Sequence, residues 1–340
     1  MIYLSTSNLS NYSALPKFTK KQSVSEIKEG DKVDDIFFVK FKKGMVSYSK
    51  GFSFELVLSD NSGRNIDYKY WGGHDEAKVK ATYNSIKADS IVRVQGRVST
   101  FNNKLQLATN EPFVIEVLKE GQYDDNDFIR PSRRNLEHLY EDLLAAVDEV
   151  SDEKIKELLN KFFRDPEFSA KFKKHPGAIE IHHNWVGGLM QHTMEVLKYC
   201  KTSGEMFSAL NKDLLIAGAL LHDIGKTEEL AVTSRIRGTN KGQLLGHIMI
   251  GSVLISAKCD EVGMEPEMRE KILHIILSHH GKMEYGSPKE PMFPEAMVVY
   301  YSDELSSKLS EIMDFVDAGR ADTEDDFMYH KRNGRNILLK

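Results

Sequence analysis

The sequence predicts a multidomain α and β protein: a small five-stranded β-barrel followed by an all-α helical bundle. Between residues 23 and 118, short runs alternate apolar and polar residues, which is the period of half-buried strands. After residue 135, apolar residues recur at every third or fourth position, as on amphipathic helices. A chain of 340 residues is long enough to form two cores of this kind.

The composition is typical of a globular protein and narrows its partners. Charged residues make up 29% of the chain, and the net charge of −5 excludes a strongly basic overall surface. Any nucleic-acid contact therefore needs a local basic patch. With only two cysteines, no disulfide framework is indicated, and we expect a cytoplasmic location. We see no secretory signal and no apolar run of membrane-spanning length, so we expect no membrane partner.

Residues 1–22 form a polar arm without a clear period, and the predicted barrel follows over residues 23–118. A short helix, Ala77–Ile86, is expected after the third strand. Five strands with a helix at this point are typical of a Greek-key barrel of the OB type. The predicted strands are Ile36–Phe41, Phe52–Leu58, Asn65–Trp71, Ile91–Val98 and Lys104–Leu107.

This module resembles OB-fold nucleic-acid-binding domains in its Asp60–Gly63 turn, its Val94–Val98 strand and its Phe101–Leu107 segment. Between residues 17 and 50 there are nine lysines against five acidic residues. Lysines beside exposed rings suit single strands, because phosphates pair with the charges and bases stack on the rings. The alternative is that the rings belong to the core and the lysines to a solvated face. The predicted strand contacts are Lys40, Phe41 and Lys42.

Residues 119–134 are charged, lack a period and contain Gly121 and Pro131, so we interpret them as a linker. The predicted helical domain covers residues 135–325. Its first helices are expected at 135–150 and 152–163, and a third begins at Asp165–Pro166. The remaining tail, residues 326–340, carries no motif that predicts a structure.

A group of polar residues lies on the inward faces of the predicted helices. The buried run Leu214–Leu221 ends in His222 and Asp223, and burying such groups is costly unless a partner binds them. Taken one at a time, each is better explained as a hydrogen-bonded core residue. Together they favour divalent metal binding. The predicted ligands are His192, His222, Asp223, His247, His279, His280 and Asp303.

Seven ligands exceed the needs of one ion, so the sequence predicts two divalent ions bridged by Asp223. One ion would be bound by His192, His222 and Asp303, and the other by His247, His279 and His280. Histidine and carboxylate ligands suit Mn²⁺ better than Mg²⁺, and Co²⁺, Fe²⁺ or Ni²⁺ are alternatives.

The pattern of His192, His222–Asp223 and Asp303 resembles the HD-domain metal-dependent phosphohydrolases. With the preceding barrel, the segment 182–189, His247 and the segment 277–288, the chain resembles the YhaM family of 3′→5′ exoribonucleases. This resemblance implies hydrolysis of single-stranded RNA, and of single-stranded DNA as a further substrate, to nucleoside 5′-monophosphates. The segment Tyr285–Pro288 departs from the Gly-Tyr-Pro order of the cyclic-dinucleotide phosphodiesterases.

Roles in catalysis follow as expectations. Asp223 would bridge the ions, and Lys226 would contact the scissile phosphate. His182 and His183 are candidates for substrate contact or protonation of the leaving group. The alternatives are a solvated helix-end lysine for Lys226 and helix capping for the two histidines.

Two other functions remain open. The chain could hydrolyse small or cyclic nucleotides, with the barrel as a regulatory module. It could instead bind nucleic acid without catalysis and use its metal structurally, although four ligands normally complete a structural site. The sequence leaves the oligomeric state open.

Overall fold

The computed structural model describes two compact units, Met1–Arg130 and Pro131–Lys340, with a division inside the predicted linker. The first unit is a closed β-barrel and the second is helical, which confirms the predicted fold class. The described residues are 16–132, 134–179, 183–232 and 235–340.

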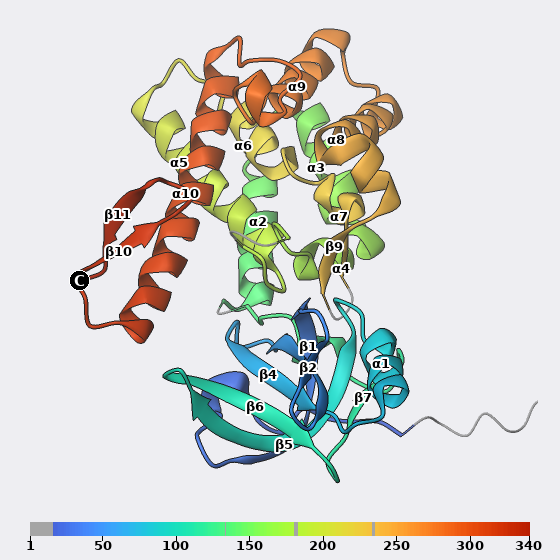
Figure 1. Cartoon of the computed structure of the whole chain (residues 1–340). Helices are drawn as coiled ribbons and strands as arrows, with labels where there is room; N and C mark the ends of the chain where they lie inside the picture. The colour runs from blue at the N-terminus through green and yellow to red at the C-terminus, as the bar shows by residue number, and fades with distance from the viewer. Residues whose placement is uncertain (1–15, 133, 180–182, 233–234) are drawn as a thin grey trace, which may run out of the picture. The chain divides into compact units, whose positions relative to one another are not determined.

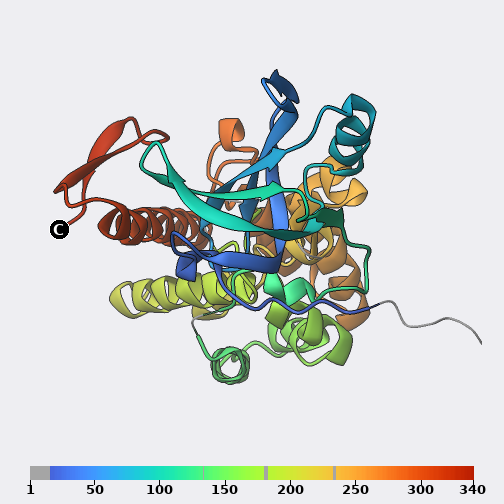
Figure 2. The same ribbon diagram turned by 60° about the horizontal axis from the view of Figure 1, so that its bottom comes forward.

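The strands of the N-terminal unit form a single sheet (Figure 1 and Figure 2). Its elements are η1 (Val24–Glu26), β1 (Lys32–Lys42), β2 (Val46–Tyr48), β3 (Gly51–Ser59), β4 (Asn65–Trp71), α1 (Glu76–Ser85), β5 (Ile91–Phe101), β6 (Lys104–Asn110), β7 (Ile115–Val117) and η2 (Asp125–Asp127). The strand order is β1-β3-β4-β6-β5, and β5 pairs again with β1 to close the barrel. β4 and β6 run parallel, whereas the other pairs of the barrel are antiparallel.

Alternation along the strands explains the barrel core. In β3, Phe54, Leu56 and Leu58 occupy every second position and are buried. In β5, Gly96 allows a close approach to β6, because a Cβ at this position would lie 2.3 Å from the Ala108 carbonyl oxygen. The sequence therefore specifies both the apolar face of the sheet and one of its tightest contacts.

Described segments on both sides of the barrel strands pack onto the barrel, whereas residues 1–15 of the predicted arm lie outside the described residues. The backbone amides of Lys21 and Gln22, in the predicted arm, donate hydrogen bonds to Asp35. At the other end, Phe128 of the predicted linker is buried in a small cluster with Ile36. The first part of the linker thus belongs to the barrel unit.

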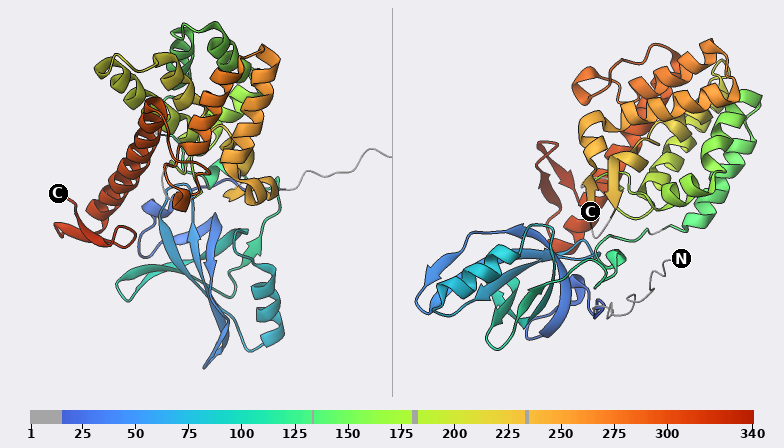
Figure 3. Two further views of the ribbon diagram at one scale, coloured as in Figure 1. Left: turned by 90° about the horizontal axis from the view of Figure 1, so that it is seen from above. Right: turned by 90° about the vertical axis from the view of Figure 1, so that its right-hand side faces the viewer.

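The C-terminal unit is a helical bundle (Figure 3). Side chains at the starts of its helices accept backbone hydrogen bonds, as is typical of N-cap residues; they include Asn135, Asp152, Asp165 and Asn211. The elements are α2 (Leu136–Asp148), α3 (Glu153–Phe163), α4 (Pro166–Lys174), α5 (Gly188–Met206), α6 (Lys212–Leu221), α7 (Lys226–Glu229), β8 (Leu230–Val232), β9 (Ile236–Gly238), α8 (Asn240–Val262), α9 (Pro266–Ser278), η3 (Met283–Tyr285), α10 (Pro294–Asp322), β10 (Phe327–His330) and β11 (Arg335–Leu338).

Helix α8 contains a break at Gly246 that was not predicted from the sequence. Gly246 has φ 69° and ψ 158°, so the helix is interrupted directly before His247. His247 opens the second helical segment, although α8 as a whole begins earlier, at Asn240. By length and composition alone α8 could cross a membrane, a test that core helices also pass. Here it packs against α3, α7 and α9.

The predicted tail forms a β-hairpin beside the end of α10, as both Figure 1 and Figure 2 show. Leu339 is buried, and a Cβ on Gly319 of α10 would lie 2.6 Å from Leu339 Cδ2. The Arg320 guanidinium donates a hydrogen bond to the Leu339 carbonyl oxygen. Helix α10 itself extends to Asp322 and so provides the surface on which the hairpin packs.

Candidate metal centre

Five segments of the helical unit bring the predicted ligands together. α5 carries His192, and α10 carries Asp303. His222 and Asp223 directly follow α6, His247 follows the break in α8, and His279 and His280 directly follow α9. Residues directly after the end of a helix are not restricted to helical backbone angles. The two consecutive residues after α6, and likewise the two after α9, can therefore both direct their side chains toward one site.

The Asp223 carboxylate lies between two groups of histidines. Its Oδ2 atom is 3.3 Å from His222 Nε2 and 3.5 Å from His192 Nε2. Its Oδ1 atom is 3.6 Å from His247 Nε2 and 3.7 Å from His279 Nε2. One oxygen therefore faces each group, which is the arrangement expected of a carboxylate that bridges two cations.

The first group contains His192, His222 and Asp303. His192 Nε2 lies 3.1 Å from Asp303 Oδ1 and 3.1 Å from His222 Nε2. The two histidines are almost completely buried. Together with Asp223 they offer two imidazole nitrogens and carboxylate oxygens, a donor set that suits first-row divalent metals.

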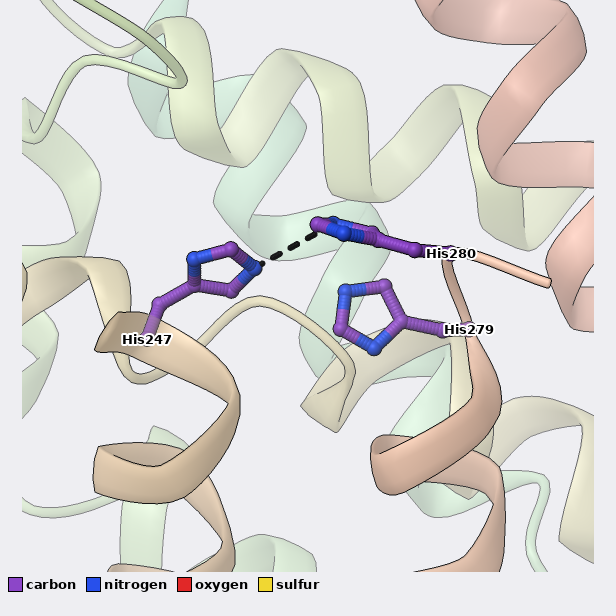
Figure 4. A group of neighbouring side chains, drawn as sticks. All are labelled: His247, His279 and His280. Atoms are coloured by element: carbon purple, nitrogen blue, oxygen red, sulfur yellow. Dashed lines mark hydrogen bonds between the residues drawn. The ribbon is translucent and has the colours of Figure 1, made fainter. Parts of the chain in front are cut away.

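The second group contains His247, His279 and His280, which Figure 4 shows pointing toward one another. His247 Nε2 lies 3.3 Å from His280 Nε2. The rings of His279 and His280 have centroids 4.4 Å apart and are nearly perpendicular. The structure thus brings all seven predicted ligands into two adjacent groups around one carboxylate.

Hydrogen bonds at the other ring nitrogen leave the facing nitrogens available to a metal. A carbonyl oxygen can only accept, so a histidine Nδ1 beside one must carry the proton and leave a lone pair on Nε2. The Nδ1 partners of the five histidines are Ser306 Oγ for His192 (3.0 Å), Ala219 O for His222 (2.8 Å), Glu229 Oε1 for His247 (3.2 Å), Ile276 O for His279 (2.6 Å) and Tyr285 O for His280 (3.0 Å).

Buried polar atoms at the centre also fit a cation. Among the described residues, Asp223 Oδ1 and His279 Nε2 are buried without a hydrogen-bond partner. Such atoms are rare in folded proteins because each costs desolvation free energy. Facing lone pairs on His192 and His222 add electrostatic repulsion. A positive ion between these atoms satisfies both requirements, so the residues present fit a divalent metal.

The charge balance points the same way. Burial alone would raise the pKa of the Asp223 carboxyl, but Lys226 and His222 hold it well below its usual range. Burial would lower the pKa of His222, yet Asp223 raises it above the ordinary value. Burial lowers the pKa of His192 to about 4, against the opposing effect of Asp303. The carboxylates stay ionised and the site favours positive charge, which a metal can supply in place of protons.

Lys226, a predicted catalytic residue, lies within reach of both Asp223 and a ligand. Its Nζ atom donates to Asp223 Oδ2 at 2.7 Å. Burial acts to lower the pKa of Lys226, but the pairing with Asp223 raises it, so the ammonium stays charged. Lys226 also lines a cavity of about 660 Å³ with His247, His279 and Asp303. This placement is incompatible with a fully solvated helix-end lysine.

His183 has a different environment from the one predicted for it. It is fully buried, does not line the cavity, and its Nε2 lies 3.1 Å from Glu195 Oε2. Its ring centroid is 5.1 Å from that of His192. These contacts make His183 a neighbour of the ligand His192, and direct contact with substrate stays a prediction. The other candidate, His182, lies outside the described residues.

Three further residues, which were not predicted from the sequence, support the ligands. Ser306 Oγ accepts from His192 and donates to Glu195 Oε2 at 2.7 Å. Burial would raise the pKa of Glu195, but hydrogen bonds from His183 and others lower it to about 2. Glu229 accepts from both Nδ1 and the backbone amide of His247. All three lie three residues after Lys226 or a ligand on a helix, a spacing that could have identified them.

The predicted strand-binding residues of the barrel divide into two kinds. Lys40 is exposed, and Phe41 has 57% of its surface exposed. Lys42, in contrast, donates hydrogen bonds to the carbonyl oxygens of Tyr83 and Ile86 at 2.6 and 2.7 Å. Burial lowers the pKa of Lys42. Its ammonium caps the end of α1, so Lys42 serves the barrel's structure, and Lys40 and Phe41 remain as the surface candidates.

Residues 189–308 match the HD domain family, and this stretch contains every predicted metal ligand. The helical unit therefore contains an HD domain, a domain of metal-dependent phosphohydrolases and phosphodiesterases. In this chain the HD domain follows an OB-like barrel.

Three solved structures are similar to parts of this chain. The HD domain of the L. monocytogenes phosphodiesterase PgpH has 18% identity and a TM-score of 0.30, over 45% of this chain and 80% of that one. The OB domain of Ta0387 from Thermoplasma acidophilum has 16% identity and a TM-score of 0.22, over 28% of this chain and 85% of that one. The p204 HINb domain has 13% identity and a TM-score of 0.22, over 28% of this chain. This chain spans about half of the p204 structure, 46%.

Proposed function

We propose that this chain is a metal-dependent 3′→5′ exoribonuclease that shortens single-stranded RNA to nucleoside 5′-monophosphates, with single-stranded DNA as a further substrate. The observation that carries the proposal is the Asp223 carboxylate, whose two oxygens face separate histidine groups beside an open cavity. The direction of degradation follows from the resemblance to the YhaM family.

The donor set would hold two divalent ions, and Mn²⁺, Co²⁺, Fe²⁺ or Ni²⁺ suits histidine and carboxylate ligands better than Mg²⁺. His192, His222 and Asp303 would hold one, His247, His279 and His280 the other, and Asp223 both. Bound divalent ions lower the pKa of water and offset the negative charge of a phosphodiester under attack.

The chain's own residues would position the substrate. Lys226 lines the cavity and carries a charge that can pair with the scissile phosphate. On the barrel, Lys40 and the exposed ring of Phe41 would contact the strand, and the exposed rings of Phe101 (61%) and Trp71 (37%) extend the choice of stacking surfaces. An OB-type barrel is a common platform for such single strands.

A second function is favoured by one observation. The cavity of about 660 Å³ lies within the usual range for small-molecule sites, so a small or cyclic nucleotide would also fit. In that case the barrel would act as a regulatory module. A purely structural metal is disfavoured, because an arrangement of seven ligands beside an open cavity differs from the closed four-ligand sites of structural metals.

The test is incubation of the protein with 5′-labelled single-stranded RNA and Mn²⁺. We expect stepwise shortening by the wild-type protein. Asp223→Asn should reduce the rate at least about 100-fold, because even outer-shell changes at metal sites cost 10- to 100-fold. RNA binding measured by fluorescence anisotropy should change little. The matched control is Asp142→Asn, which removes the same charge from an exposed position on α2.

Two results would contradict the proposal. An Asp223→Asn variant that degrades RNA at the wild-type rate would remove the role of the bridging carboxylate. A wild-type protein that hydrolyses cyclic dinucleotides while leaving RNA intact would support the second function instead.

A further inference from the structure

The turn of the C-terminal hairpin forms part of the wall of the metal cavity. Arg332 and Asn333, between β10 and β11, line this cavity together with Ser307, Lys308 and Glu311 of α10. The turn lies beyond residue 308, where the HD domain match ends. The cavity of this chain therefore includes a wall that the matched domain does not supply.

The turn is held in place by packing on α10. The ring of His330 meets that of Phe315 edge to face, with centroids 4.5 Å apart. Within the turn, the Asn333 amide donates to His330 Nδ1 at 3.1 Å, and Gly334 adopts a positive φ of 62°. Since His330 is itself buried, the turn presents Arg332 from a fixed base.

Arg332 is the least engaged of the cationic side chains in the described cavity wall. Lys226 pairs with Asp223 at 2.7 Å, and Lys308 pairs with Glu304 at 2.6 Å. Arg332 has a single, long contact, 3.5 Å from Nη1 to Glu311 Oε1, and its side chain is 60% exposed. A guanidinium has five N–H donors, so most of them remain available to an anion.

The position of Arg332 separates it from the reacting centre. Its partner Glu311 lies eight residues after Asp303 on the same helix, which corresponds to about 12 Å along the axis. The Arg332 guanidinium, which contacts Glu311, is therefore associated with a later turn of α10 than the one that carries Asp303. The guanidinium is placed to meet another anionic group of the same ligand, farther along the cavity.

We propose that Arg332 binds a second phosphate of the substrate, next to the scissile one along the strand. The inference rests on the proposed function and specifies how its substrate is recognised: a strand with a second phosphate binds more tightly than one with the scissile phosphate alone. Planar guanidinium groups bind phosphate oxygens in a bidentate manner, which gives both affinity and register. Arg332 is thus a specificity residue contributed by the hairpin.

The experiment compares two substrates that differ in the second phosphate. The dinucleoside monophosphate ApA contains only the scissile phosphate, whereas the trinucleotide ApApA contains one more. With Mn²⁺, Arg332→Ala should raise KM for ApApA about tenfold, leave its kcat nearly unchanged, and leave both constants for ApA unchanged. Arg332→Lys should be intermediate, because it keeps the charge but loses the planar fork.

The matched control is Lys331→Ala, which removes a charge from the same exposed turn at a residue that does not line the cavity. It should leave KM unchanged for both substrates. Equal effects of Arg332→Ala on ApA and ApApA, or no effect on either, would overturn the role of Arg332. A wild-type protein that cleaves neither substrate would instead overturn the proposed function.

Discussion

The hydrogen bond between Ser306 and His192 offers a direct test of the metal centre without changing a ligand. Ser306→Ala removes the oxygen that accepts from His192 Nδ1 at 3.0 Å, while the ligand atom Nε2 is untouched. Both residues are buried, so water has little access to replace the lost partner. We expect weaker metal binding at the site formed by His192, His222 and Asp303.

The magnitude follows from that geometry. Leaving one buried N–H without a partner costs about 1–3 kcal/mol, and about 1.4 kcal/mol corresponds to a factor of ten in a binding constant. Mn²⁺ affinity at this site should therefore fall about 10- to 100-fold, in line with other outer-shell changes. The site of His247, His279 and His280 should be unaffected, because its Nδ1 partners are different.

Calorimetric titration of metal-free protein with Mn²⁺ measures both sites. Ser302→Ala is the matched control: it removes another buried α10 serine, whose hydroxyl lies 3.6 Å from Cys200 Sγ and outside the ligand set. If Ser306→Ala binds Mn²⁺ as tightly as the Ser302→Ala and wild-type proteins, the proposed ligand role of His192 is wrong. An independent check is thermal unfolding, where each tenfold loss of affinity should remove about 1.4 kcal/mol of metal-induced stabilisation.

Two further predictions concern folding. Burial lowers the pKa of His175 to about 4, below its unfolded value, so its contribution to stability is complete above pH 6.5 and is lost as pH falls toward 4. Between pH 7 and pH 5 the advantage of wild type over His175→Gln should shrink by about 2 kcal/mol in urea unfolding; a constant difference would contradict this. Gly96→Ala should destabilise the barrel by about 1–3 kcal/mol, because the new Cβ would meet the Ala108 carbonyl. Gly44→Ala, which meets nothing within 4 Å, is the control, and equal unfolding free energies would refute the close contact.

The sequence predicted a residue's burial best where that burial depends only on the residue's position within its own helix or strand. Alternation predicted β4 at its observed bounds, Asn65–Trp71, and placed the helix after it. The inward spacing of His192 and Asp303 predicted that they would meet, and they lie 3.1 Å apart. Such predictions work because burial of a helical face or a strand face depends on local period alone.

Features that depend on long-range packing were not predictable in the same way. The spacing of Ser306 and Glu195 from the ligands could have identified each residue, but the hydrogen bond between them joins positions 111 residues apart, and nothing in the local pattern of either indicates that contact. The break at Gly246 is not specified by the presence of glycine, which helices also tolerate. The hairpin, however, had a usable signal: Asn333–Gly334 is a typical hairpin turn pair, and it went unrecognised.

At Asp223, the folding of the helical bundle and the binding of metal ions depend on the same contacts. The Nε2 atoms of His192 and His222 lie 3.1 Å apart, and those of His247 and His280 lie 3.3 Å apart. Carbonyl oxygens beside the Nδ1 atoms of His222 and His280 hold the proton on the opposite side of each of these two rings. The apolar residues of α6 are packed in the core next to this site, and without positive charge the facing lone pairs oppose the approach of the rings. A cation converts the same contacts from repulsive to attractive, so the free energy of metal binding is also free energy of folding for this part of the chain. What distinguishes this core from the core of a helical bundle without a metal site is the group of histidine Nε2 atoms that face one another with unshared electron pairs.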